Sequence, residues 1–131
     1  MLNNRDEQVL THILRHCLKV ERTLDRVGRD FDIFVEDADF IDSVCLNIMQ
    51  IGELAGSLSE EFISSTKDRI PWRAIVGMRN IIAHHYGTIE VDRMWRTALE
   101  DIPILEHFCE EQFQEISLVQ DDVPGFGQIM F

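Results

Sequence analysis

The first thirty residues carry a helical repeat in which basic and apolar side chains occupy opposite faces. The basic residues recur at alternating steps of four and three. At about 100° per residue, these steps keep them on one side of a helix. They are Arg15, Lys19, Arg22, Arg26 and Arg29, and the apolar residues opposite them are Ile13, Cys17, Val20, Leu24 and Val27. The pattern predicts a helix over about residues 5–28 whose apolar face is buried against other helices.

The rest of the chain divides into further helices by apolar periodicity and by helix start and stop signals. These are expected at about residues 38–56, 59–65, 71–86 and 89–115. The predicted fold class is therefore all-α, an antiparallel bundle of about five helices. Pro103 falls inside the last helix, where its ring and its missing N–H group predict a kink.

Length and composition suit one domain with a single core, because the chain has 131 residues and 45% of them are hydrophobic. We expect this domain over residues 1–116 and a flexible tail over residues 117–131. The apolar residues Phe126, Ile129 and Phe131 in this tail could alternatively dock on a partner.

The expected location is the cytoplasm, without a membrane partner. No apolar run approaches the length of a membrane-spanning helix, and the opening residues MLNNRDEQ are too polar for a signal peptide. The three cysteines, Cys17, Cys45 and Cys109, are odd in number and lie in apolar helical contexts. They are expected to be reduced core thiols rather than disulfides or metal ligands.

The segment IPWRAIVGMRNIIAHHY, residues 70–86, is the most informative about function. Placed on a helix, it has a polar arc and an apolar arc. The polar arc carries Arg79, Asn80, His84 and Tyr86, with the small residues Ala83 and Gly87 between them. The apolar arc, expected to be buried, carries Ile75, Met78, Ile81 and Ile82, with His85 at its boundary. His84 is therefore interpreted as the reactive histidine.

An arginine and a histidine in one accessible cleft suit RNA cleavage without a metal ion. An imidazole can move protons at a ribose hydroxyl, and a guanidinium can hold the phosphate as charge builds on it. The alternative for Arg79 and His84 is a polar helix seam at a subunit interface.

The same residues carry a family resemblance. Arg79-x4-His84-x-Tyr86 resembles the RX4HXY motif of the HepT-like toxins, which belong to the HEPN superfamily of helical ribonucleases. The flanking segments IMQIGELAGSLSEEF and VDRMWRTALEDIPILE are similar to the family's segments and follow in the same order. The resemblance covers roughly residues 5–115.

The resemblance implies the toxin of a type II toxin-antitoxin system, a metal-independent endoribonuclease without a cofactor. Arg79 and His84 would cleave RNA, and Asn80 would orient the phosphate or the imidazole. It also implies a HEPN-type homodimer with its cleft at the interface, and a cognate minimal nucleotidyltransferase antitoxin that transfers AMP to Tyr86. The sequence leaves open whether dimers pair into a larger assembly. The alternatives are a non-catalytic dimer that binds a nucleotide or a partner protein, and an ordinary interface tyrosine at Tyr86.

The net charge of −12 opposes RNA binding at long range. The basic residues are confined to residues 1–29 and 67–96, and the second segment has six of them against three acidic residues. Candidate contacts for RNA or for an acidic antitoxin surface are Arg73 and four residues of the first helix: Arg15, Lys19, Arg22 and Arg26. The alternative for these four residues is a solvated helix face balanced by acidic neighbours.

Other residues are expected to support the site or the dimer. Glu53 could pair with Arg79, or it could be an ordinary surface carboxylate. The dimer interface is expected to include the motif helix and the helix around Pro103, with apolar contact from Trp95 and Leu99. No metal site is expected, because the histidine pair of the first helix, His12 and His16, lacks a third ligand at a matching spacing.

Overall fold

The computed structural model describes residues 2–119, and over this range it contains helices and no strand. This confirms the all-α fold class. The elements are α1 (Asn4–Arg26), α2 (Phe31–Glu36), α3 (Ala38–Ala55), α4 (Glu60–Thr66), α5 (Trp72–His85), the 3₁₀-helix η1 (Tyr86–Thr88), α6 (Val91–Arg96), the π-helix η2 (Thr97–Asp101) and α7 (Ile102–Val119). Most of the predicted tail, including Phe126, Ile129 and Phe131, lies outside the described residues.

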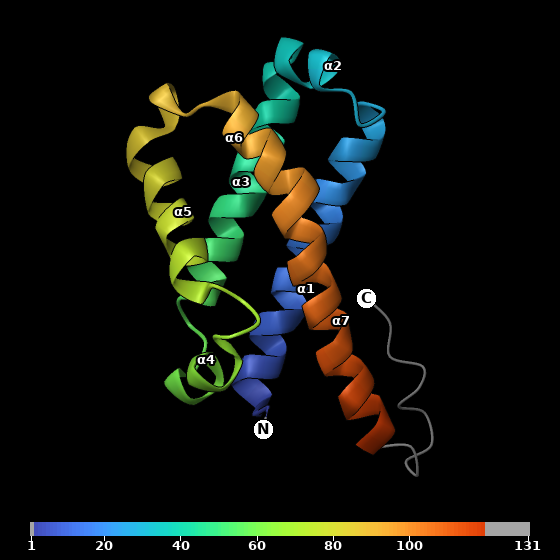
Figure 1. Cartoon of the computed structure of the whole chain (residues 1–131), viewed down its shortest axis with the longest axis vertical. Coiled ribbons are helices and arrows are strands. Elements are labelled where there is room, and N and C mark those ends of the chain that lie inside the picture. The colour runs from blue at the N-terminus through green and yellow to red at the C-terminus, as the bar shows by residue number, and fades with distance from the viewer. Residues whose placement is uncertain (1, 120–131) are drawn as a thin grey trace.

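Helix α3 occupies the middle of the fold (Figure 1). It packs against α1 on one flank and against α5 on the other, and α7 packs against α1. The apolar face predicted for α1 is buried here, as at Ile13, Cys17 and Val20. Its basic face is exposed. The core therefore forms around α1, α3 and α7, whereas α5 stands on the outer side of α3.

Polar caps start helices α1 and α4 and join them. The side chain of Asn3 accepts a hydrogen bond from the backbone of Asp6 at 2.7 Å, at the start of α1. The buried carboxylate of Asp6 in turn accepts bonds from Ser59, from its backbone N–H at 2.9 Å and from its hydroxyl at 2.6 Å. Ser59 itself caps α4. The beginnings of α1 and α4 are thus held together by one satisfied buried carboxylate.

Helix α2 was not predicted from the sequence. It has only six residues, which is too short to show a helical period. Its place is set by tertiary contact: Phe34 is fully buried, with its ring centroid 4.8 Å from that of Trp95. The expectation that Trp95 supplies apolar contact to a second subunit is therefore wrong, because this indole is already covered within the chain.

The expected helix over residues 89–115 is divided, and the expected disturbance at Pro103 takes the form of a π-helix. The five residues of η2, Thr97–Asp101, directly precede α7, whose second residue is Pro103. In an α-helix the N–H of residue 103 would bond to the carbonyl of residue 99, and proline has no N–H. The wider turn of the π-helix η2 accommodates this missing hydrogen bond, and α6 and α7 continue in the same direction (Figure 1).

The prediction that the cysteines lie in the core is confirmed, because Cys17, Cys45 and Cys109 are buried, and all three are free thiols. Burial, with a smaller effect of nearby acidic groups, raises the pKa of Cys45 to about 11 and that of Cys109 to about 12. Thiols in this state are poor nucleophiles. Among the residues that the structure describes, no helix combines the length and apolar character needed to cross a membrane.

Candidate active site on helix α5

The motif helix α5 is supported mainly from one side, by α3. Only Trp72 and Ile82 of its residues are buried. The predicted burial of Ile75, Met78 and Ile81 is only partial: Ile75 and Met78 pack against the core but stay partly exposed, and Ile81 is also partly exposed. A helix in contact along one flank leaves its remaining surface, polar and apolar, open to other molecules.

The contact between α3 and α5 is closest at Gly52. A Cβ atom added to this residue would lie 2.4 Å from Arg79 Cβ and 2.9 Å from the carbonyl oxygen of Ile75. Carbon atoms do not approach to 2.4 Å, so the two backbones can be this near only because residue 52 has no side chain. Gly52 was not among the site residues predicted from the sequence. The available signal was a glycine in a helix interior, which costs about 1 kcal/mol relative to alanine and therefore suggests a packing reason.

Three of the predicted site residues meet beside this contact. The Arg79 Nε–H group donates to Glu53 Oε2 at 2.7 Å, and Arg79 Nη1 donates to Asn80 Oδ1 at 3.1 Å. The pairing of Glu53 with Arg79 is thus present in the structure. The Arg79 side chain is 34% exposed and that of Glu53 is 62% exposed. Such a solvated pair adds little stability, but it limits where the guanidinium can point.

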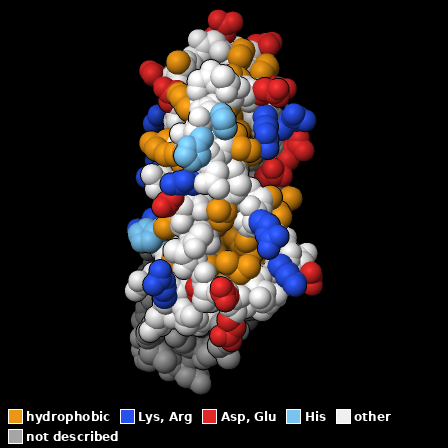
Figure 2. Space-filling model, turned by 90° about the vertical axis from the view of Figure 1, so that its left-hand side faces the viewer, with side chains coloured by type: hydrophobic (Ala, Val, Ile, Leu, Met, Phe, Trp, Pro, Cys, Tyr) orange, Lys and Arg blue, Asp and Glu red, His pale blue; other side chains and the backbone are white. Residues whose placement is uncertain are grey.

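His84 does not join this cluster. It is exposed in the last turn of α5, and no hydrogen bond to its ring occurs among the side chains described up to residue 114. It lies about 7.5 Å further along the helix axis than Arg79 and about 140° around it. Arg73, also exposed, shares the His84 side of the helix at roughly 20° from it. Figure 2 shows histidine and basic side chains on this side of the molecule.

The positions predicted for Tyr86 and His85 need correction. Helix α5 ends at His85, whose φ of −132° and ψ of 27° depart from α-helical values, and Tyr86 opens η1. The prediction that Tyr86 continues the α5 face of Arg79 is therefore wrong. Tyr86 is 48% exposed. His85, interpreted from the sequence as a packing or boundary residue, is also exposed, which excludes the packing role. Helix periodicity could not predict these positions, because it assumes that the helix continues through Tyr86, whereas α5 ends at His85.

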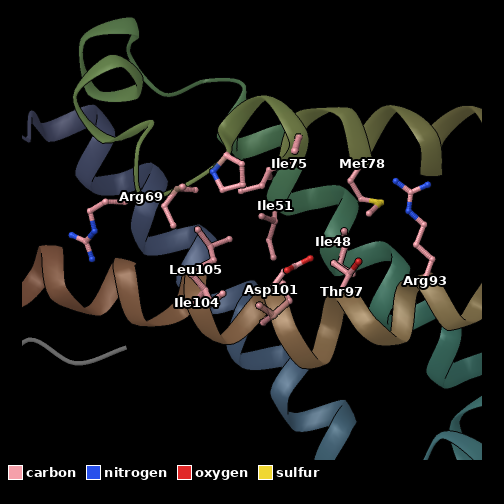
Figure 3. Close-up of a pocket in the computed structure, with 14 residues that line it drawn as sticks. Ile48, Ile51, Arg69, Ile75, Met78, Arg93, Thr97, Asp101, Ile104 and Leu105 are labelled. Carbon is pink, nitrogen blue, oxygen red and sulfur yellow. The ribbon is translucent and has the colours of Figure 1, made fainter.

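An apolar groove of about 430 Å³ lies on another side of α5. Its walls are α5 and the η2–α7 segment, and α3 supplies Ile48 and Ile51. Ile75 and Met78, the partly exposed residues of α5, face into it, with Arg69 toward one end and Arg93 toward the other (Figure 3). The groove is the space left where α5 diverges from α7.

The basic residues of α1 lie on the opposite flank of α3 from α5. At the seam, His16 Nδ1 lies 2.8 Å from Asn47 Oδ1. Four members of the predicted stripe are exposed and form no ion pair with the described side chains: Arg15, Lys19, Arg22 and Arg26. Arg29 does not belong with them. It follows the end of α1 with a φ of 55° and pairs with Glu21 and Asp25.

No group of three or more histidine, cysteine or acidic residues in the described part of the chain could hold a metal ion. His16, one of the two histidines considered for such a site, is occupied by Asn47. The groups available for chemistry around α5 are therefore a braced guanidinium, a neighbouring amide and a freely accessible imidazole.

Residues 13–112 match the ribonuclease HepT-like family. The chain belongs to this family, and its class is therefore that of an RNA-cleaving enzyme. The match also confirms the resemblance drawn from the motif and the expected endoribonuclease activity.

Individual relatives agree. A candidate RNase of Caldanaerobacter subterraneus subsp. tengcongensis is 34% identical over 107 residues, covering 81% of this chain and 92% of the relative. A candidate RNase of Methanocaldococcus jannaschii is 26% identical and covers 72% of each chain. A probable ribonuclease HepT of Thermococcus cleftensis is 36% identical over 56 residues, 43% of this chain and 50% of the relative. No solved structure matches the chain.

His84 and Ile82 lie two residues apart on α5, but truncating them should change the free energy of unfolding by very different amounts. We expect His84→Ala to change the free energy of unfolding by less than about 0.5 kcal/mol, because an exposed, unbonded side chain supports little. Ile82→Ala should cost about 2–5 kcal/mol, because it empties a buried site. Urea denaturation followed by circular dichroism measures both. A His84→Ala loss as large as that of Ile82→Ala would show that the imidazole has a structural role.

Proposed function

We propose that this protein is the toxin of a toxin-antitoxin system, a metal-independent endoribonuclease that uses Arg79 and His84. The observation that carries the proposal is the contrast between these two groups on one helix. Arg79 is held by Glu53 and Asn80, as suits a group that binds phosphate in a defined direction. His84 is exposed and unbonded among the described side chains, as suits a group that exchanges protons with a substrate.

In the proposed reaction the ribose 2′-oxygen attacks the adjacent phosphorus while an imidazole accepts its proton. The bond from phosphorus to the 5′-oxygen then breaks, and that oxygen takes a proton from an imidazolium, leaving a 2′,3′-cyclic phosphate and a 5′-hydroxyl. Arg79 stabilises the charge that builds on the phosphorane oxygens, and Asn80 orients the phosphate or the imidazole. Every proton moved in this scheme is carried by histidine or water.

A homodimer would supply a histidine opposite Arg79, which a single chain lacks. Arg79 and His84 point about 140° apart on α5, so a second copy of the motif could place its histidine opposite the first arginine and divide acid and base roles. The apolar groove beside α5 supports an interface there, because Ile75 and Met78 are left partly exposed and Ile104 of α7 is 59% exposed. We propose that a second copy covers this face.

Arg73 and the four unpaired basic residues of α1 are proposed contacts for RNA phosphates or for an acidic antitoxin surface. All five are exposed, which leaves their charges available. They flank α3 on opposite sides, since Arg73 is on α5 and the others are on α1. A partner that uses both groups would have to extend across α3.

The purified protein should cleave single-stranded RNA in the presence of EDTA and leave 2′,3′-cyclic phosphate ends. Arg79→Ala or His84→Ala should lower the rate by about 10²-fold or more, because each removes a group that acts in the transition state. Gel assays with end analysis measure this, and expression in cells should show growth arrest with the wild type but not with Arg79→Ala or His84→Ala. The matched control is His85→Ala, which removes the exposed neighbouring imidazole. RNA binding without cleavage would instead favour a non-catalytic binding module.

We expect Ile104→Arg to convert the dimer into a monomer of about 15.3 kDa, as measured by light scattering at micromolar concentration. The reason is that a charge placed in an apolar interface loses its hydration without a partner. Ile33→Arg on α2 is the control, because Ile33 is similarly exposed, at 51%, and lies outside the groove. A wild-type protein that is monomeric and fully active would contradict the proposed composite site.

We further propose that a minimal nucleotidyltransferase antitoxin silences the enzyme by modifying Tyr86. The phenol oxygen would attack the α-phosphorus of ATP, releasing pyrophosphate and a proton. Support comes from its exposure of 48% and from its position in η1, directly after the motif helix. An adenylate there would bring a bulky anion next to the groups that bind RNA.

Tyr86→Phe should retain ribonuclease activity but escape silencing by the antitoxin and ATP, because only the hydroxyl is lost. Mass spectrometry of the co-expressed wild-type protein should show an adenylate mass on the peptide that contains Tyr86. An unmodified Tyr86 in a fully silenced complex would indicate inhibition by occlusion, and the tyrosine would then be an ordinary interface residue.

A further inference from the structure

We propose that Gly52 is a positioning residue for Arg79, through the close contact that it allows between α3 and α5. This inference rests on the proposed function and adds a residue outside the RX4HXY motif to its machinery. The need for glycine here is steric, because the backbone of Gly52 lies within α3 and has no positive φ. What the position requires is the absence of a Cβ atom facing Arg79.

The contact involves the Cα and Cβ atoms of Arg79, from which the rest of its side chain extends. The hypothetical Cβ of residue 52 meets Arg79 Cβ at 2.4 Å and the Arg79 Cα at 3.3 Å. It also meets the Ile75 carbonyl oxygen at 2.9 Å, one turn earlier in α5. A backbone atom cannot rotate away as a long side chain can. Even one methyl group at residue 52 must therefore displace α5 or turn it.

Displacement of α5 would change the ion pair beside the contact. Glu53 follows Gly52 directly in α3, and its carboxylate reaches Arg79 Nε at 2.7 Å. Because this pair is largely solvated, its own energy is too small to hold two helices in place. Its geometry therefore depends on the packing at Gly52, and so does the direction of the guanidinium.

A second glycine, at the C-cap of α3, provides a matched comparison. Gly56 follows α3 one turn later, and a Cβ atom added there would meet its nearest neighbour, the Glu53 carbonyl oxygen, at 3.5 Å. That is an ordinary van der Waals distance. Gly56→Ala should be accommodated where Gly52→Ala is not, although both variants add the same methyl group, one within α3 and the other at its C-cap.

The first test does not depend on ribonuclease activity. The side-chain Nε–H signals of arginine are followed by ¹⁵N NMR in the full chain, with the Arg79 signal assigned from its absence in Arg79→Lys. A hydrogen bond to a carboxylate should shift this signal away from the position of solvated arginines. We expect Gly52→Ala to move it toward that solvated position, Glu53→Gln to do the same, and Gly56→Ala to leave it unchanged.

The second test measures RNA cleavage by the same variants. Gly52→Ala and Glu53→Gln should lower kcat by about 10²-fold, the order expected from a misplacement of about 1 Å, with KM changed by less than about twofold. Gly56→Ala should cleave like the wild type. A merely structural loss would instead lower the amount of folded enzyme and leave kcat per folded molecule unchanged.

The outcomes separate the two proposals. If Gly52→Ala folds and keeps both the wild-type Arg79 signal and the wild-type kcat, Gly52 positions nothing. If Gly52→Ala does not fold, Glu53→Gln decides: an unchanged Arg79 signal and kcat in that variant would overturn the inference. A wild-type protein that cleaves no RNA would remove the proposed function, whereas the NMR comparison would still decide the positioning role.

Discussion

Helix α3 has to pack on two flanks at once, and the arrangement of the molecule follows from how it does so. Toward α1 the contact includes side chains, with a polar seam at His16 and Asn47. Toward α5 the two backbones come unusually close at Gly52, where an added Cβ atom would lie 2.9 Å from the Ile75 carbonyl oxygen, beside the side-chain pair of Glu53 and Arg79. The first contact forms a conventional core. The second holds one further helix at a defined distance without enclosing it.

This one-sided support of α5 explains why so much chemistry is exposed on a single helix. An α-helix packed on all sides would bury Ile75 and Met78 and leave no groove, and it would also cover Arg79 and His84. Here the apolar residues line a groove toward α7, and the polar residues remain accessible elsewhere on the same helix. Exposed apolar surface of this kind marks a place where a protein binds another molecule. The exposed groove therefore supports the proposed interface on this face of α5.

The distribution of charged residues agrees with an exposed site on α5. A net charge of −12 keeps RNA away from most of the surface. Basic residues without ion pairs among the described side chains, such as Arg73 and Lys19, remain on α5 and α1. The guanidinium nearest the proposed chemistry, that of Arg79, is paired. Its partner Glu53 lowers the local positive charge but restricts the direction of Arg79. The pair therefore orients the guanidinium while weakening its electrostatic attraction for phosphate.

The sequence by itself determined the helical class, the buried face of α1 and the residues that carry the motif, because these depend on periodicity and on residue type within one element. It also indicated the pairing of Glu53 with Arg79, although it left a solvated carboxylate equally open. Tertiary structure decided what depends on contact between elements. The end of α5 at His85 moved Tyr86 off the helix face, and the packing of Trp95 against Phe34 withdrew the indole from any interface. The importance of Gly52 also emerged only there, since a missing side chain has meaning only when the atom that would collide with it is known.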